Sequence, residues 1–312
     1  MPLVISSRFF TILTMNKHIT NKNKILTVLG CGVALLFTGS SAYAAATVWT
    51  GTTNDVFGTA GNWTNNAPGE DGADSLATIG NGDTVNLTTA YTSSDPFRLE
   101  LQGNSTLNVS AAVTVNRLTD IGAGSTLNLL DGSAFTMPKI SSGNNEGWTI
   151  DGTLEISGGT HAFNERLFGS GTIRVVGNDS DIHFNQIVNA LNYEFEFDAT
   201  GVSSLIGGGT GIGTSGAGPY WSALGTSTLT VDGSAFNGTG AFTLLETTSN
   251  AASTFNMSNV TITGLGAENV GWTLEQGIDG SKNIITLNVI PEPSSAALLG
   301  LGGLALILRR RK

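Results

Sequence analysis

The side chains best able to carry chemistry in this sequence are carboxylates that fall into two short groups. They are Asp179, Asp181, Glu194, Glu196 and Asp198. Residues two apart on a β-strand point to the same face, so each group would gather its charges on one side. Neighbouring like charges raise one another's pKa, and a cation such as Ca²⁺ relieves the repulsion. We interpret the carboxylates as a solvated acidic face of a protein without a resident cofactor or metal, and a structural Ca²⁺ site at these residues is the alternative.

The remaining polar residues do not indicate a catalytic centre. His161 and His183 lack the spacing of metal ligands, and we expect both on the surface. No Gly-x-Ser-x-Gly elbow precedes a predicted helix, and the Gly-rich stretches lack the lysine of a phosphate-binding loop. We therefore expect a protein that is not an enzyme. The alternative is a lyase-like enzyme acting on polysaccharides, in which Asp179, Asp181 and a basic residue would converge in one groove.

Charge is divided unevenly along the 312 residues. The two ends of the chain hold eight of the 14 Lys and Arg, which leaves six in residues 45–290 against 23 Asp and Glu, a net charge of −17. A domain this acidic repels nucleic acid and anionic lipid, so nucleic-acid binding is excluded. Cys31 is the single cysteine. Residues 45–290 therefore have no disulfide and depend on core packing and backbone hydrogen bonds.

The central region repeats a segment of the form Gly-x-Ser/Thr-apolar-x-apolar. The first apolar residues of its copies are Leu107, Leu127, Leu154, Ile173 and Leu229, and the last gap is more than twice as long as any other. Each copy alternates apolar and polar residues as a half-buried strand does. Short but unequal gaps favour an irregular β-solenoid, in which each coil buries its apolar face against the next. We predict an all-β fold of this kind over residues 45–290.

Asp-Gly and Gly-Gly pairs between the predicted strands indicate tight corners. They are Asp131-Gly132, Asp151-Gly152, Gly158-Gly159 and Asp232-Gly233, and we expect them to supply positive φ angles. The phrase Asp-Gly-Ser-Ala-Phe occurs twice, ending at Phe135 and at Phe236. We interpret each copy as a turn followed by an inward-facing phenylalanine.

The opening and closing segments of this region resemble the first and last coils of autotransporter-type passenger domains. The similarity rests on Gly/Thr/Asn patterns around Trp49, Trp63 and Trp272. It implies a right-handed β-solenoid in which these three tryptophans pack at the ends. The alternative fold is a carbohydrate-binding β-sandwich, which would expose coplanar aromatic residues such as Tyr220 and Trp221.

The amino end has the layout of a secretory signal peptide. Three lysines precede the apolar residues 25–37, and Ala42 and Ala44 form an Ala-x-Ala cleavage site. We expect a signal peptide over residues 1–44, translation beginning at Met15, and passage through the Sec export machinery. Cys31 lies in a loose lipobox, so a lipoprotein anchored through Cys31 is the alternative.

The carboxyl end combines a short motif, an apolar stretch and a basic terminus. Its parts are Pro291, Glu292 and Pro293, then residues 294–308, then Arg309, Arg310, Arg311 and Lys312. Together they resemble the PEP-CTERM sorting signal of Gram-negative bacteria. The resemblance implies a short hydrophobic transmembrane helix over part of residues 291–312, with the basic residues as a stop on the cytoplasmic side. It also implies a transient stay in the inner membrane and removal of the tail by exosortase, a membrane-embedded transpeptidase.

These features lead to one expected function. We expect an exported protein of the cell surface or of the extracellular biofilm matrix, structural or adhesive in role, with exosortase, the Sec machinery and an exopolysaccharide as partners. The polysaccharide-active enzyme and the carbohydrate-binding module remain the alternatives.

Overall fold

The structure is a computed structural model that describes most of the central region and part of the carboxyl end. The described residues are 46–51, 54–70, 75–115, 117–138, 147–187, 190–207, 224–247, 254–265, 270–279, 282–291 and 295–309. The predictions for residues 1–44, including Met15, Cys31, Ala42 and Ala44, lie outside this part, as do Tyr220 and Trp221.

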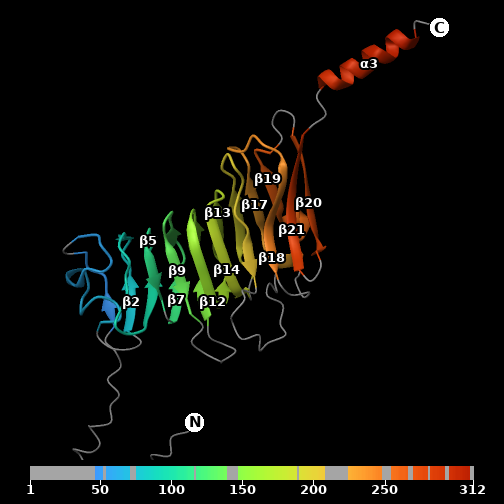
Figure 1. Cartoon of the computed structure of the whole chain (residues 1–312). Coiled ribbons are helices and arrows are strands. Elements are labelled where there is room, and N and C mark those ends of the chain that lie inside the picture. The colour runs from blue at the N-terminus through green and yellow to red at the C-terminus, as the bar shows by residue number, and fades with distance from the viewer. Residues whose placement is uncertain are drawn as a thin grey trace, which may run out of the picture. The chain divides into compact units, whose positions relative to one another are not determined.

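The described fold is mostly β and consists of two sheets whose strands are mostly parallel (Figure 1). Sheet 1 contains, in spatial order, β1 (Thr47–Val48), β2 (Ser75–Ile79), β4 (Phe97–Leu101), β7 (Arg117–Ile121), β10 (Gly147–Ile150), β12 (Gly159–Gly169), β14 (Ser180–Ile187), β16 (Leu205–Gly207), β18 (Gly240–Thr247), β21 (Lys282–Pro291) and β20 (Val270–Asp279), with β6 (Ala112–Thr114) and β9 (Ala134–Met137) as a side branch on β12. Sheet 2 contains β3 (Thr84–Leu87), β5 (Thr106–Val109), β8 (Thr126–Leu129), β11 (Thr153–Ile156), β13 (Thr172–Val176), β15 (Asn192–Glu196), β17 (Leu229–Asp232) and β19 (Val260–Thr263).

The chain visits the two sheets in turn, which produces stacked coils. From β10 to β19 successive strands alternate between sheet 1 and sheet 2, and each strand up to β17 pairs in parallel with the strand of the next coil. Earlier coils add the short strands β6 and β9, and the long strand β12 pairs with β9 through its first half and with β10 through its second. This parallel stacking agrees with the predicted coil arrangement.

The repeated segments form the centre of sheet 2. The apolar column predicted from the repeats runs through Leu107, Leu127, Leu154 and Ile173, which are opposite one another in register. All four side chains are buried, with exposures of 1% or less. Tyr193 of β15 stands between Ile173 and Leu229. Among the described residues, the long gap between the last two repeats therefore contains one further strand of sheet 2, β15, whose sequence does not match the repeat.

Aromatic rings fill the middle of the sheet 1 side of the core. Phe163 stacks on Phe184 with ring centroids 4.6 Å apart and on Trp148 at 5.2 Å. All three rings are at most 1% exposed. Phe135 and Phe236, the ends of the two Asp-Gly-Ser-Ala-Phe phrases, are also buried, which confirms their prediction as inward-facing residues.

Only two of the four predicted corner pairs contain a glycine with a positive φ. Gly132 has a φ of 77° and Gly159 a φ of 89°. The prediction is wrong for Gly152 and Gly233, which lie outside that region. Gly152 is required for another reason, because a Cβ there would lie 2.2 Å from the carbonyl oxygen of Ser125. This corner selects glycine through close approach of two coils rather than through backbone conformation.

The amino-terminal coil is closed by tryptophans, as predicted. Trp49 and Trp63 are each 4% exposed, and their rings meet edge to face with centroids 5.2 Å apart. The indole nitrogen of Trp63 donates a hydrogen bond to the carbonyl oxygen of Phe57 at 2.7 Å. The prediction fails for Trp272, which lies on the edge strand β20 and is 38% exposed.

Parallel stacking ends at an antiparallel hairpin. β21 runs antiparallel to β18 on one side and to β20 on the other. Beyond Pro291, the last residue of β21, the next described element is α3 (Ser295–Arg309), the one α-helix in the described residues (Figure 1). This helix confirms the predicted hydrophobic segment. Among the described helices, however, none is both long enough and apolar enough to cross a membrane, so α3 does not support the expected transmembrane helix.

Candidate functional site

The five predicted carboxylates are divided between the two sheets. Asp181 lies on β14 of sheet 1 and Asp179 just before it, whereas Glu194 and Glu196 lie on β15 of sheet 2. Asp198 follows the end of β15. Within the described residues no group of three or more His, Cys, Asp or Glu side chains has an arrangement that could hold a metal ion. The structure therefore does not assemble the predicted set into one site.

The glutamates of sheet 2 surround an arginine instead. Arg174 of β13 pairs in register with Glu155 of β11 and Glu194 of β15. Its guanidinium contacts Glu155 Oε2 at 2.5 Å, forms a shorter contact with Glu196, and lies 4.0 Å from Glu194 Oε2. The predicted relief of repulsion by a cation thus occurs, but a side chain from the neighbouring coil supplies the charge.

The protonation of Arg174 follows from these contacts. Partial burial alone would lower the pKa of the guanidinium, but hydrogen bonds and charge from Glu196 and Glu155 outweigh it and raise the pKa. Arg174 is consequently held in its charged form and bridges the glutamates of neighbouring coils.

The acidic members of sheet 1 have separate surroundings. Asp181 is 57% exposed through its side chain and contacts Nε2 of His183 at 2.9 Å. Arg166, the other basic residue near this region, lies six residues along β12 from Thr160, the register partner of Asp181. Six residues of strand span about 20 Å. The described residues therefore do not bring Asp179 and Asp181 together with Arg166 in the way that the lyase-like alternative predicts.

Asp198 lies just after β15 and is part of a turn. Its carboxylate accepts hydrogen bonds from the hydroxyl and amide of Thr200, both at 2.6 Å, and from the amide of Gly201 at 2.9 Å. The hydrogen bond from the Thr200 hydroxyl, together with those from the backbone amides, lowers the pKa of Asp198, although burial opposes this. The aspartate fixes the corner that follows β15.

The two histidines differ from each other. His183 is partly exposed, in agreement with the predicted surface position, but His161 is fully buried, so the prediction for His161 is wrong. Its Nδ1 accepts a hydrogen bond from the amide of Phe135 at 3.2 Å, and its Nε2 lies 2.7 Å from the carbonyl oxygen of Gly158. Burial lowers the pKa of His161, although the Gly158 carbonyl and the charge of Asp181 oppose this. A neutral ring that donates from Nε2 satisfies both contacts.

A ladder of asparagines on sheet 2 was missed by the sequence reasoning. Asn108 donates from Nδ2 to Oδ1 of Asn86 at 2.9 Å, and Asn128 donates to Oδ1 of Asn108 at 2.8 Å. Asn86 in turn donates to a carboxylate oxygen of Asp55 at 2.7 Å. The signal was present in the sequence, because Thr-apolar-Asn occurs in two of the repeated segments, at residues 106–108 and 126–128, and once before them, at residues 84–86. In the next two coils Glu155 and Arg174 occupy this column.

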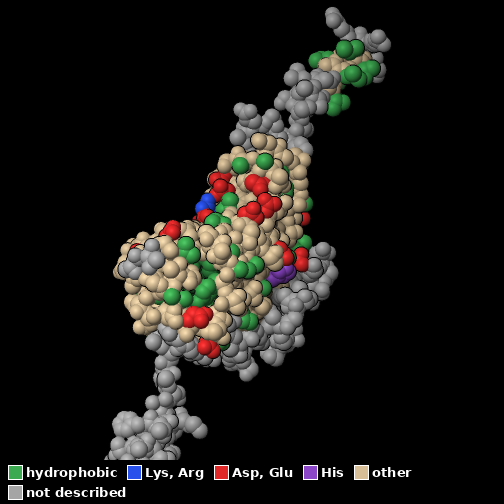
Figure 2. Space-filling view, turned by 60° about the vertical axis from the view of Figure 1, so that its left-hand side comes forward, with side chains coloured by type: hydrophobic (Ala, Val, Ile, Leu, Met, Phe, Trp, Pro, Cys, Tyr) green, Lys and Arg blue, Asp and Glu red, His purple; other side chains and the backbone are tan. Residues whose placement is uncertain are grey.

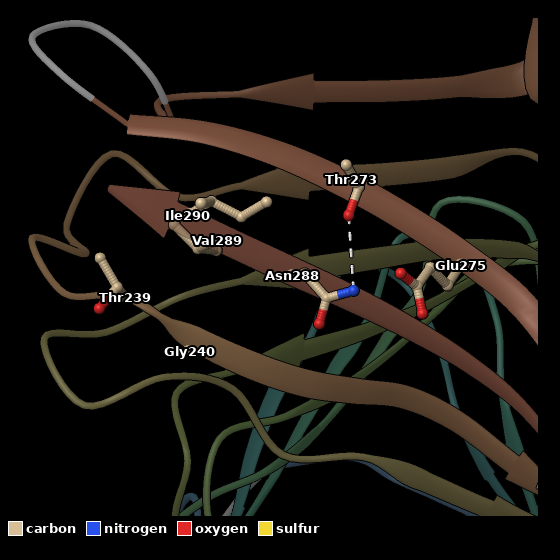
Figure 3. Close-up of a pocket in the computed structure, with 7 residues that line it drawn as sticks. All are labelled: Thr239, Gly240, Thr273, Glu275, Asn288, Val289 and Ile290. Atoms are coloured by element: carbon tan, nitrogen blue, oxygen red, sulfur yellow. Dashed lines mark hydrogen bonds between the residues drawn. The ribbon is translucent and has the colours of Figure 1, made fainter. Parts of the chain in front are cut away.

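The outer surface of the described residues is acidic and includes a shallow groove. On the face drawn in Figure 2, Asp and Glu side chains are widely spread and basic ones are scarce. The groove lies over the end of the β18–β21–β20 sheet and encloses about 470 Å³ (Figure 3). It is lined by Thr239, Gly240, Thr273, Glu275, Asn288, Val289 and Ile290. Asn288 donates to the hydroxyl of Thr273 at 3.4 Å across its floor.

The predicted sorting motif begins in this same region. Pro291 is the last residue of β21 and pairs with Val270 of β20. Glu292 and Pro293 lie outside the described residues. Of the basic cluster, Arg309 ends α3, whereas Arg310, Arg311 and Lys312 are outside the described part.

Comparison with known proteins identifies the carboxyl-terminal tail. Residues 289–312 match the model of the PEP-CTERM protein-sorting motif. No curated protein and no solved structure matches the chain. The match supports an exported, cell-surface-associated protein that is sorted through exosortase.

Proposed function

We propose that this chain is a structural or adhesive component of the cell surface or the extracellular matrix and that it is not an enzyme. Export through the Sec machinery, a transient stay at the inner membrane and removal of residues 291–312 by exosortase would deliver residues 45–290. The working domain would be a right-handed β-solenoid of the autotransporter-passenger type. The strong preference for right-handed crossovers between parallel strands supports this hand.

The observation that carries the proposal is the use of polar side chains to join neighbouring coils. The Asp55–Asn86–Asn108–Asn128 ladder and the Arg174 cluster both run across strands of sheet 2. These side chains bind one another rather than converging on a single point, as catalytic groups must. Stacked coils joined in this way suit a stable spacer or scaffold.

An exopolysaccharide is the partner that we assign to the outer surface. The groove over β18, β21 and β20 offers hydroxyl, amide and carboxylate groups from Thr239, Thr273, Asn288 and Glu275. Such groups suit the hydroxyls of a sugar chain. Because the domain is strongly acidic, a neutral polysaccharide fits better than an acidic one.

Two measurements test the role. The purified domain, incubated with acidic polysaccharides and Ca²⁺, should release no unsaturated sugars, and their release would overturn the non-enzymatic role. Cells lacking the gene should retain less matrix at their surface, and the wild-type chain should restore it. Unchanged surface matrix in the deletion strain would contradict the structural role.

A further inference from the structure

The sorting segment and the folded sheet share residues. The match to the sorting motif begins at Val289, whereas β21 continues to Pro291. Val289 is opposite Gly240 of β18 and Trp272 of β20, and Ile290 and Pro291 are opposite Gly271 and Val270. The first three residues of the matched segment are thus paired in the sheet. Figure 3 shows Val289 and Ile290 of this segment.

The side chains at this end of β21 differ in how deeply they are buried. Val289 is 3% exposed, whereas Ile290 is 48% exposed. Pro291 has no amide hydrogen and can donate no hydrogen bond to β20. The sheet therefore holds Val289 firmly, and the strand loosens within two residues beyond it.

Few residues connect the end of β21 to the tail helix α3. Three residues, 292–294, separate Pro291 from Ser295, the first residue of α3. Three extended residues cover about 10 Å. An enzyme that binds a peptide in extended form uses the peptide's backbone hydrogen-bonding groups. The backbone groups of Val289 and Ile290 belong to β21, which at this end is already paired with β18 and β20.

We propose that the end of the β20–β21 hairpin controls sorting, because exosortase can engage the segment only after Val289–Pro291 separate from the sheet. Trp272 and Val289 are then positioning residues, because they determine the fraction of molecules in which Val289–Pro291 have separated from the sheet. This inference rests on the proposed exosortase route. When only a fraction of molecules is competent, the apparent affinity of the enzyme falls by that fraction.

Two variants of the full chain test the proposal while keeping an unbroken copy of the matched segment. The first inserts Gly-Ser-Gly-Ser-Val-Ile between Ile290 and Pro291, so that β21 keeps Val289 and Ile290 and a second Val-Ile precedes the motif. The second is Trp272→Ala, which loosens β20 opposite Val289. Val231→Ala is the matched control, because Val231 is fully buried on β17 of sheet 2 and lies outside the hairpin.

Tail removal is followed by pulse-chase in cells that contain exosortase. We expect about a tenfold faster loss of the tail for the insertion, equivalent to about 1.4 kcal/mol of opening free energy. Trp272→Ala should lose its tail several-fold faster than the wild type. The rate of tail loss should be close to that of the wild type for Trp272→Phe and unchanged for Val231→Ala. Equal rates for the insertion and the wild type would overturn the proposal. Retention of the tail by every variant would instead refute the exosortase route on which the proposal rests.

A reversible disulfide between β20 and β21 should slow tail removal in a chain of unchanged length. Thr273 and Asn288 are opposite each other on β20 and β21, and neither belongs to the matched segment. In the Thr273→Cys/Asn288→Cys variant, oxidation should slow tail removal and a reductant should restore it. Processing at one rate in both redox states would contradict control by the hairpin.

Discussion

Replacing Arg174 by glutamine should destabilise the stack of coils by about 1–2 kcal/mol, the sum of lost ion pairs and new repulsion. The guanidinium contacts Glu155 and Glu196 directly and lies 4.0 Å from Glu194. With a side chain that is 35% exposed, each ion pair contributes only about 0.2–1 kcal/mol because water screens it. The substitution also leaves like charges facing one another on neighbouring strands, which costs a similar amount for each pair.

Urea unfolding of residues 45–290 measures this loss directly. Arg174→Lys is the control, because it keeps the charge but lacks the forked donors and should lose less. Screening by about 1 M salt should reduce the difference between Arg174→Gln and the wild type. Ca²⁺ should restore part of the stability of Arg174→Gln, whose glutamates then lack a cation, and should leave the wild type unchanged. A free energy of unfolding for Arg174→Gln equal to that of the wild type would refute the charge-bridge role.

Three further substitutions probe the core and the ladder. Asn108→Ala removes two amide hydrogen bonds from sheet 2 and should lower the free energy of unfolding by about 1–2 kcal/mol, as measured in urea. Leu127→Ala, at a fully buried position, should cost about 2–5 kcal/mol in the same assay. His161 has a pKa lowered by burial from its ordinary value of 6.5, so below that pH the unfolded state binds more protons and stability falls as pH drops. His161→Phe should therefore lose less stability than the wild type between about pH 7 and pH 5, and parallel curves would contradict this.

The repeated strands could be predicted because their periodicity is local. Leu107, Leu127 and Leu154 each follow a glycine and alternate with polar residues, and their register in sheet 2 follows from that pattern. Tyr193 occupies the same column without a matching sequence. A large buried residue fits there because it packs against Phe255 of a later segment, with ring centroids 5.6 Å apart. That contact joins residues far apart in the chain, so the local sequence around Tyr193 does not predict it.

The grouping of the carboxylates could not be predicted, since it depends on which sheet each strand joins. Asp181 and Glu194 lie on consecutive strands, yet the chain passes from sheet 1 to sheet 2 between them. Arg174 reaches Glu196 because the stacking of successive coils places β13 and β15 side by side. His161 was misjudged for a related reason, as the amide of Phe135 that satisfies it comes from the preceding coil.

The most direct test of the exosortase route is the fate of the tail in cells with and without exosortase. With the enzyme present, mass spectrometry of the surface-exposed protein should find a chain that lacks the basic terminus from Arg309 onward. Without the enzyme, the tail should remain attached and the protein should be absent from the surface. A surface protein that keeps its tail in the presence of exosortase, or loses it in the enzyme's absence, would contradict sorting through residues 289–312.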